Sequence, residues 1–253
     1  MADTQTIAAP RSIPHWGLFG TVAWGASIAL AFVVVQSIVL VAYLKRTLGE
    51  TDLPEDQFQE SLLAAADNGV IISLATLATA IICVPMILGI AKLKRGSRLT
   101  DYLALNPIAW RTLGVWLSIT IVFIALADAL TLALGRPVTS EFMLSAYRSA
   151  NPAWLIWLAF VVGAPLFEET FFRGFLFKGL QPALTPVGAI VVTAAVWAAI
   201  HIQYDLYGIV TLFISGLLLG AARVRTNSLF TPLAMHALMN IVANSQAALA
   251  VNG

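Results

Sequence analysis

Charged residues are scarce in this chain of 253 residues, and cysteine is nearly absent. Charged side chains make up 11% of the sequence and apolar ones 59%, whereas a soluble domain carries about 25% and about 45–50%. This balance excludes an ordinary soluble domain and indicates a polytopic membrane protein. The single cysteine, Cys83, excludes a disulfide framework and a cysteine-based metal site. We expect it to fill space in a membrane helix.

The chain also lacks a long basic run and an internal repeat. With a net charge of +1, nucleic acid is not an expected partner. A cleaved signal peptide is not expected either, because the apolar run 16–44 is too long for one and residues 1–15 form a polar tail. The lack of a repeat disfavours a transporter, since many transporter folds are built from repeats.

Long apolar runs are what the chain does have. A helix needs about 20 apolar residues to cross a bilayer. The sequence therefore predicts an all-α, polytopic transmembrane helical bundle of about seven spans, possibly eight segments, with an intramembrane polar cavity. The predicted spans are residues 16–44, 70–91, 110–134, 153–177, 185–202, 207–222 and 229–250.

The loops between these runs differ in charge. Residues 49–67 are read as an acidic polar loop, whereas residues 92–111 hold five basic side chains. By the positive-inside rule, the basic loop and the N-terminus lie in the cytoplasm. We expect a multi-pass protein of the plasma membrane, with the lipid bilayer as a partner. In residues 136–152, Thr139 or Ser140 is predicted to cap a short interfacial helix.

Glu168, Glu169 and Arg173 interrupt an otherwise apolar segment. An ionised side chain at the bilayer centre costs about 2.5–3.5 kcal/mol on insertion scales, so we expect these charges to have a function. Glu169 and Arg173 are four residues apart and are predicted to pair on one helix face. Glu168 would be the freer carboxylate, available as a general base. The alternative is an inert buried network that fixes helix packing.

Two histidines lie on later apolar segments. His201 follows Trp197 by four residues, and His236 precedes Asn240 by four, so each pair shares a helix face. Singly, each histidine could hydrogen-bond a neighbouring helix. Polar groups in a membrane face the bundle interior, which favours their convergence with the carboxylates. If every predicted helix crosses the whole bilayer without a break, the two histidines differ in their depth in the membrane by roughly 13 Å. We therefore expect a misplaced helix end or a tilted, broken or re-entrant segment.

Three motifs on three apolar segments now stand in order: Glu168-Glu169-x-x-x-Arg173, Trp197-x-x-x-His201 and His236-x-x-x-Asn240. This order and spacing resembles the CPBP family of intramembrane proteases, the CAAX-processing and bacteriocin-processing (Abi-type) enzymes related to type II CAAX prenyl endopeptidase. The chain departs from the family at Trp197, where Phe is most common. The resemblance divides the chain into a tail (1–15), a transmembrane region without recognised motif (16–152), a catalytic region (153–246) and a C-terminal tail (247–253).

The resemblance implies an intramembrane endopeptidase that acts on a prenylated or other peptide, or on a membrane-protein substrate. Glu168 would activate the attacking water, and His201 would hold that water or the developing charge. His236 and Asn240 would stabilise the oxyanion. The residues that would support the site are Glu169, Arg173 and Trp197.

Other readings remain open at this stage. The set Glu168, His201 and His236 would suit zinc with water in the fourth place, although metal-free glutamate chemistry is slightly favoured. Asp128 and Asp205 are further acidic candidates, more simply read as a helix-end acid and a loop residue. The alternatives to a protease are a proton-coupled transporter and a non-catalytic membrane scaffold, because buried Glu and His also form proton relays. The sequence lacks a His-Glu-x-x-His motif, and a catalytic dyad of Ser215 with His236 is the weaker assignment.

Overall fold

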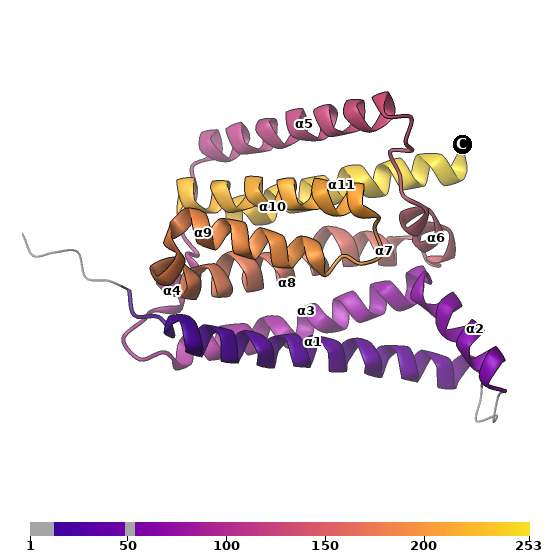
Figure 1. The fold of residues 1–253 in the computed structure, drawn as a ribbon, viewed down its shortest axis with the longest axis horizontal. Coiled ribbons are helices and arrows are strands. Elements are labelled where there is room, and N and C mark those ends of the chain that lie inside the picture. The colour runs from indigo at the N-terminus through magenta and orange to yellow at the C-terminus, as the bar shows by residue number, and fades with distance from the viewer. Residues whose placement is uncertain (1–12, 49–53) are drawn as a thin grey trace, which may run out of the picture.

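The computed structural model describes residues 13–48 and 54–253, which are helical without strands (Figure 1). The predicted all-α class is confirmed, and most of the predicted N-terminal tail lies outside the described residues. The elements are α1 (Gly17–Leu48), α2 (Glu55–Ala66), α3 (Gly69–Leu93), α4 (Leu99–Leu103), α5 (Trp110–Ala133), α6 (Glu141–Ser149), α7 (Trp154–Leu158), η1 (Ala159–Gly163), α8 (Ala164–Glu168), η2 (Glu169–Leu176), α9 (Phe177–Ala199), α10 (Leu206–Thr226) and α11 (Phe230–Asn252), of which η1 and η2 are π-helical.

Five helical runs of the described residues are long and apolar enough to cross a membrane, which makes the protein an integral membrane protein. They are Gly17–Thr47, Gly69–Leu93, Trp110–Ala133, Trp154–Ala199 and Leu206–Thr226. The fourth run contains two of the seven predicted spans. The seventh predicted span is α11, which is not among the five because polar residues lower its hydropathy. It runs to Asn252, through most of the predicted C-terminal tail.

The run Trp154–Ala199 is two helical arms joined at Thr185, where φ is 63° and ψ is 165°. Pro186 follows and disfavours helical backbone at the residue before it. The chain reaches one end of the bundle and returns along it (Figure 1). The returning arm, residues 186–199, extends only about 20 Å at 1.5 Å per residue, less than the ~30 Å hydrocarbon core. This arm is therefore too short to cross the bilayer by itself, and the break at Thr185 agrees with the expectation of a broken segment in this region.

The predicted acidic loop 49–67 is wrong over most of its length. Residues 55–66 form α2, whose first turn carries Glu55 and Asp56 at the positive end of the helix dipole. Residues 49–53 lie outside the described part of the chain. The predicted short helix is confirmed as α6, whose cap is Ser140: its Oγ accepts a hydrogen bond from the Met143 N–H at 3.3 Å. Its interfacial position stays a prediction.

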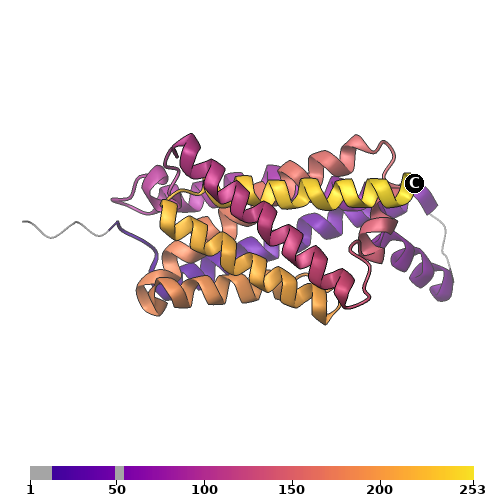
Figure 2. The same cartoon turned by 90° about the horizontal axis from the view of Figure 1, so that it is seen from above.

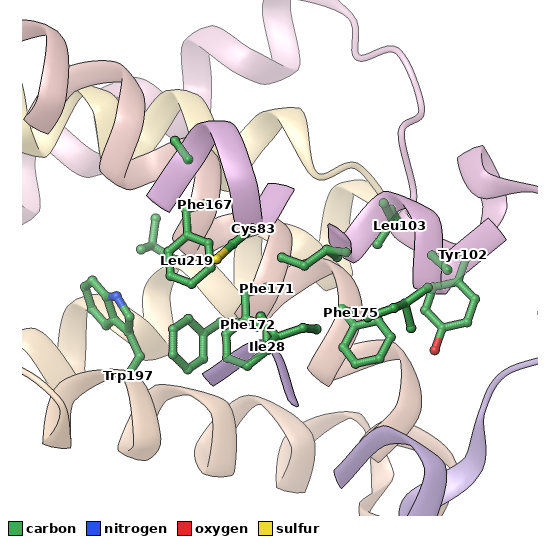
Figure 3. Close-up of a cluster of buried hydrophobic side chains, with 14 of the residues drawn as sticks. Ile28, Cys83, Tyr102, Leu103, Phe167, Phe171, Phe172, Phe175, Trp197 and Leu219 are labelled. Atoms are coloured by element: carbon green, nitrogen blue, oxygen red, sulfur yellow. The ribbon is translucent and has the colours of Figure 1, made fainter. Parts of the chain in front are cut away.

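The core is built around a row of phenylalanines on α8 and η2. Phe167, Phe171, Phe172 and Phe175 are buried against residues of α1 and α3, among them Cys83 (Figure 3). Cys83 is fully buried in this apolar cluster, so the prediction that it fills space in a membrane helix is confirmed. On the other side, α5 lies obliquely across α10 and α11 at the outside of the bundle (Figure 2). The phenylalanines therefore hold α8 and η2 between α1 and α3 on one side and α5, α10 and α11 on the other.

Gly179 allows α1 and α9 to approach closely. A Cβ atom at this position would lie 1.8 Å from Thr21 Oγ1 and 2.6 Å from Thr21 Cβ. Thr21 is fully buried, so it has no free space into which it could rotate. Only a glycine permits the observed contact between the two helices.

We expect Gly179→Ala to lower the free energy of unfolding by about 1–3 kcal/mol, because the added methyl group must push α1 away from α9. Thermal unfolding of the detergent-solubilised protein measures this loss. The matched control is Gly89→Ala in α3, where a Cβ would meet nothing within 4 Å. Equal unfolding temperatures for the two variants would show that this contact does not matter.

Candidate functional site

Glu169 and Arg173 form the buried ion pair that their spacing predicts. Arg173 NH1 lies 3.1 Å from Glu169 Oε1, and the two side chains are 1% and 0% exposed. Arg173 NH2 also donates to the Gly216 carbonyl at 3.3 Å, and its guanidinium lies 4.7 Å from the centre of the Trp197 ring. The pair thus connects η2 to both α9 and α10.

His236 of α11 joins the same carboxylate. Its Nδ1 lies 2.8 Å from Glu169 Oε1. A carboxylate only accepts hydrogen bonds, so the proton of this bond sits on Nδ1. The other ring nitrogen, Nε2, then faces Glu168 Oε2 at 4.0 Å. Glu169 therefore sets which nitrogen of His236 points toward the second carboxylate.

Glu168 differs from Glu169 in exposure and in partners. Its side chain is 16% exposed, whereas Glu169 is fully buried. Trp197 Nε1 donates a hydrogen bond to Glu168 Oε2. The sequence predicts only a packing role for Trp197. Its indole N–H is a donor that phenylalanine does not have, and this difference in side chains was the signal in the sequence.

His201 is connected to this group through Trp197. The His201 Nδ1 bonds the Trp197 carbonyl at 2.7 Å, so its Nδ1 carries the proton and its Nε2 is left as an acceptor. The Trp197 ring lies between both imidazoles, edge to face, with ring centroids 5.1 Å from His201 and 5.4 Å from His236. His201 is half-buried at the end of the returning arm of α9.

Asn240 lies one turn beyond His236 on α11, but its amide contacts a different element. Its Nδ2 donates to the Phe160 carbonyl of η1 at 2.7 Å. In a π-helix, hydrogen bonds span five residues, and such stretches are often found at functional sites. The sequence analysis did not anticipate the two π-helical stretches, of which η2 carries Glu169 and Arg173 and η1 supplies the partner of Asn240.

The other candidates lie outside this group. Asp128 accepts a hydrogen bond from Gln246 Nε2 at 2.7 Å and so links α5 to α11. Asp205 caps α10 through the Gly208 N–H at 2.9 Å and pairs with Arg136. The Gly208 N–H and the Arg136 charge lower the pKa of Asp205, which is exposed in a loop as predicted.

The serine alternative and a zinc site find no support in the geometry. Ser215 Oγ donates to the Thr211 carbonyl of its own helix at 2.9 Å. Within residues 13–48 and 54–253, no three His, Cys, Asp or Glu side chains are grouped closely enough to hold a metal ion. Glu168, His201 and His236 therefore do not fit the three-ligand zinc set that was considered. Two cavities of the structure are lined by other residues, and the predicted intramembrane cavity stays a prediction.

Comparisons with known proteins bear on the half of the chain that holds this group. Residues 150–242 match the family model for type II CAAX prenyl endopeptidase Rce1-like proteins. An uncharacterized 24.3 kDa protein of Escherichia coli is 32% identical over 136 residues, which cover 50% of this chain and 61% of that protein. The chain thus spans about three fifths of the length of this curated relative.

No solved structure matches the chain. The matched segment begins just before α7 and ends within α11, so it contains all three motifs found in the sequence. The resemblance predicted from those motifs is confirmed over residues 150–242, which are similar to the Rce1-like, type II CAAX prenyl endopeptidase proteins.

Proposed function

We propose that this protein is an intramembrane endopeptidase in which Glu168 activates water to hydrolyse a peptide bond of a membrane-associated substrate. The Rce1-like family supports a protease, and the helices support a membrane protein. The observation that carries the assignment of Glu168 is its setting. It is the partly exposed carboxylate of the pair, held by the Trp197 N–H and facing His236 Nε2.

The gap between Glu168 and His236 has the size of a bridging water. The distance from Glu168 Oε2 to His236 Nε2 is 4.0 Å, too long for a direct hydrogen bond. Two hydrogen bonds of about 2.8 Å that meet at roughly a right angle span about 4.0 Å. A water in this gap would donate one proton to Glu168 and keep a lone pair for attack on the scissile carbonyl carbon.

The reaction then needs no group beyond those of the chain, the water and the substrate. The water proton moves to Glu168 Oε2 as the C–O bond forms and the carbonyl oxygen becomes an oxyanion. Collapse of the tetrahedral intermediate breaks the C–N bond. Glu168 returns the proton to the leaving amine and is regenerated as a carboxylate.

His236 and Asn240 are the donors that we propose for the oxyanion. Asn240 Nδ2 carries two hydrogens, and only one is taken by the Phe160 carbonyl. His236 would act through Nε2, the ring nitrogen that faces Glu168. His201, whose Nε2 is an acceptor, would instead orient the water or substrate. Losing one oxyanion donor costs about 10²–10³ in rate in enzymes that use such donors.

Glu169 and Arg173 are proposed to act through position alone. Both are buried at the meeting point of η2, α10 and α11. Neither has the exposed surface needed to reach a substrate, so their role would be to hold His236 and Trp197 around Glu168.

The charges at the helix ends support an orientation in the membrane. One end of the bundle, which we call the basic end, carries Lys92, Lys94, Arg95, Arg98, Arg111, Lys178, Arg223 and Arg225. The positive-inside rule favours this end in the cytoplasm. We therefore propose that the N-terminal side of α1 is cytoplasmic and that the protein spans the plasma membrane. The proposed division at residue 153 separates α1–α6 from the helices that carry the catalytic residues.

Glu168→Gln tests the proposal directly. The carboxamide keeps the shape but cannot take the water proton, so cleavage should fall at least about 10³-fold. The assay is mass spectrometry of farnesylated CAAX-type peptides and of unprenylated peptides incubated with the protein in proteoliposomes. The control is Glu60→Gln, the same change at an exposed carboxylate of α2. Wild-type cleavage by Glu168→Gln would refute the mechanism, and loss of pH-dependent flux instead would favour a transporter.

Trp197→Phe removes the indole donor but keeps an aromatic ring in the core. A hydrogen bond to a charged group contributes about 1.5–3 kcal/mol, so kcat should fall roughly 10- to 100-fold while the protein stays folded. The control is Trp157→Phe on α7, the same substitution at a tryptophan without a side-chain hydrogen bond among the described residues. If both variants retain kcat, the Trp197 N–H does not hold Glu168 for catalysis.

Glu169→Gln should lower the free energy of unfolding of the protein. It leaves the buried Arg173 without its counter-charge, and breaking a buried pair in this way costs about 3–5 kcal/mol. Thermal unfolding in detergent measures the loss, with Glu168→Gln as the matched change one residue earlier. Equal unfolding temperatures for the two variants would contradict a structural role for Glu169.

A further inference from the structure

A polar cavity of about 230 Å³ lies at the basic end and is lined by residues other than those of the candidate active site. It is formed between α4, α9, α10 and the segment before α1. Its polar lining residues are Asp101, Asn106, Lys178, Gln181, Arg223 and Asn227. The proposed hydrolysis uses none of these side chains.

Arg223 is the unusual member of this lining. It is only 4% exposed, and its Nε is buried without a hydrogen-bond partner. Its guanidinium packs 5.6 Å from the centre of the Phe177 ring and makes one long bond, from NH1 to Asn227 Oδ1 at 3.4 Å. Among residues 13–48 and 54–253, no carboxylate pairs with it.

Comparison with Arg173 shows which partners the Arg223 guanidinium lacks. Arg173 is also buried, and its Nε likewise has no partner, but its other nitrogens bond a carboxylate and a backbone carbonyl. A guanidinium offers five N–H donors, and an uncompensated buried charge is costly. The protein therefore holds at Arg223 a charge and a set of donors that an anion in the cavity would satisfy.

Neighbouring cations add to the positive potential of the cavity. Lys178 lines it directly, and both Lys178 and Lys94 lie near His15, two residues after the lining residue Ile13. Burial, and then the positive charges of Lys178 and Lys94, lower the pKa of His15. Asp101 is the one carboxylate of the lining, and in the described part of the chain it forms no salt bridge with Lys178 or Arg223.

We propose that this cavity binds a phosphate group, and that the phosphate belongs to the headgroup of an anionic phospholipid. Arginine binds phosphate oxygens bidentately, lysine adds a point charge, and the amides of Asn106 and Gln181 can donate further hydrogen bonds. Cavities that enclose whole drug-sized molecules measure about 300–1,000 Å³, so this smaller one suits a headgroup alone. Basic pockets between transmembrane helices on the cytoplasmic side commonly bind anionic headgroups.

The test measures binding to the detergent-solubilised full chain by its thermal unfolding temperature, which rises with ligand occupancy. The probes are dihexanoyl phosphatidylglycerol, dihexanoyl phosphatidylcholine and inorganic phosphate. We expect saturable stabilisation by the phosphatidylglycerol and an apparent Kd at least tenfold higher for Arg223→Gln. Lys178→Gln, at a less buried position, should weaken binding in the same direction.

The control variant is Arg225→Gln, which removes the same charge from an exposed position two residues away. It should bind phosphatidylglycerol like the wild type. In the absence of lipid, Arg223→Gln should unfold at or above the wild-type temperature, because it removes an unpaired buried charge. A purely structural arginine would instead destabilise the protein when lost.

The outcomes of these measurements test both the existence of the site and the source of the phosphate. Tight binding of inorganic phosphate that depends on Arg223 would retain the phosphate site and overturn the lipid as its source. Equal weakening by Arg223→Gln and Arg225→Gln, or no stabilisation by any probe, would overturn the site itself. None of these measurements depends on proteolysis, so they stand or fall separately from the proposed function.

Discussion

The arrangement of the site depends on one buried carboxylate. Glu169 accepts hydrogen bonds from Arg173 within η2 and from His236 on α11, in a place that water does not reach. Arg173 in turn contacts α10 through the Gly216 carbonyl and α9 through the Trp197 ring. Burying these charges is favourable only if all partners are present at once, so the helices that carry the motifs must meet in one way.

Spacing rules recovered the parts of this arrangement that are local in sequence. The pairing of Glu169 with Arg173 follows from a separation of four residues, and the cap of α6 follows from Ser140. The convergence of Glu168 with His236 needed a further premise, that polar groups in a membrane seek one another. The pairing follows from helical periodicity and the convergence from the cost of exposing polar groups to lipid, and both can be judged from a single sequence.

The features that sequence reasoning missed depend on tertiary geometry. The Trp197 N–H reaches Glu168 only because the chain reverses at Thr185 and returns beside η2. Asn240 finds the Phe160 carbonyl because η1 departs from α-helical hydrogen bonding. No propensity marks a π-helical turn in an apolar run, and a proline predicts that a helix breaks but not the direction in which the chain continues.

The low hydropathy of α11 has a consequence for biogenesis. A helix that carries His236, Asn240 and Asn244 partitions poorly into lipid alone and gains its partners from helices already in the bilayer. Among the helices that carry the proposed catalytic groups, α11 comes last in the chain and is therefore synthesised last. The catalytic groups that we propose are therefore complete only after α11 has entered the bilayer and packed against η1 and η2, so earlier stages of insertion hold the carboxylates without His236 and Asn240.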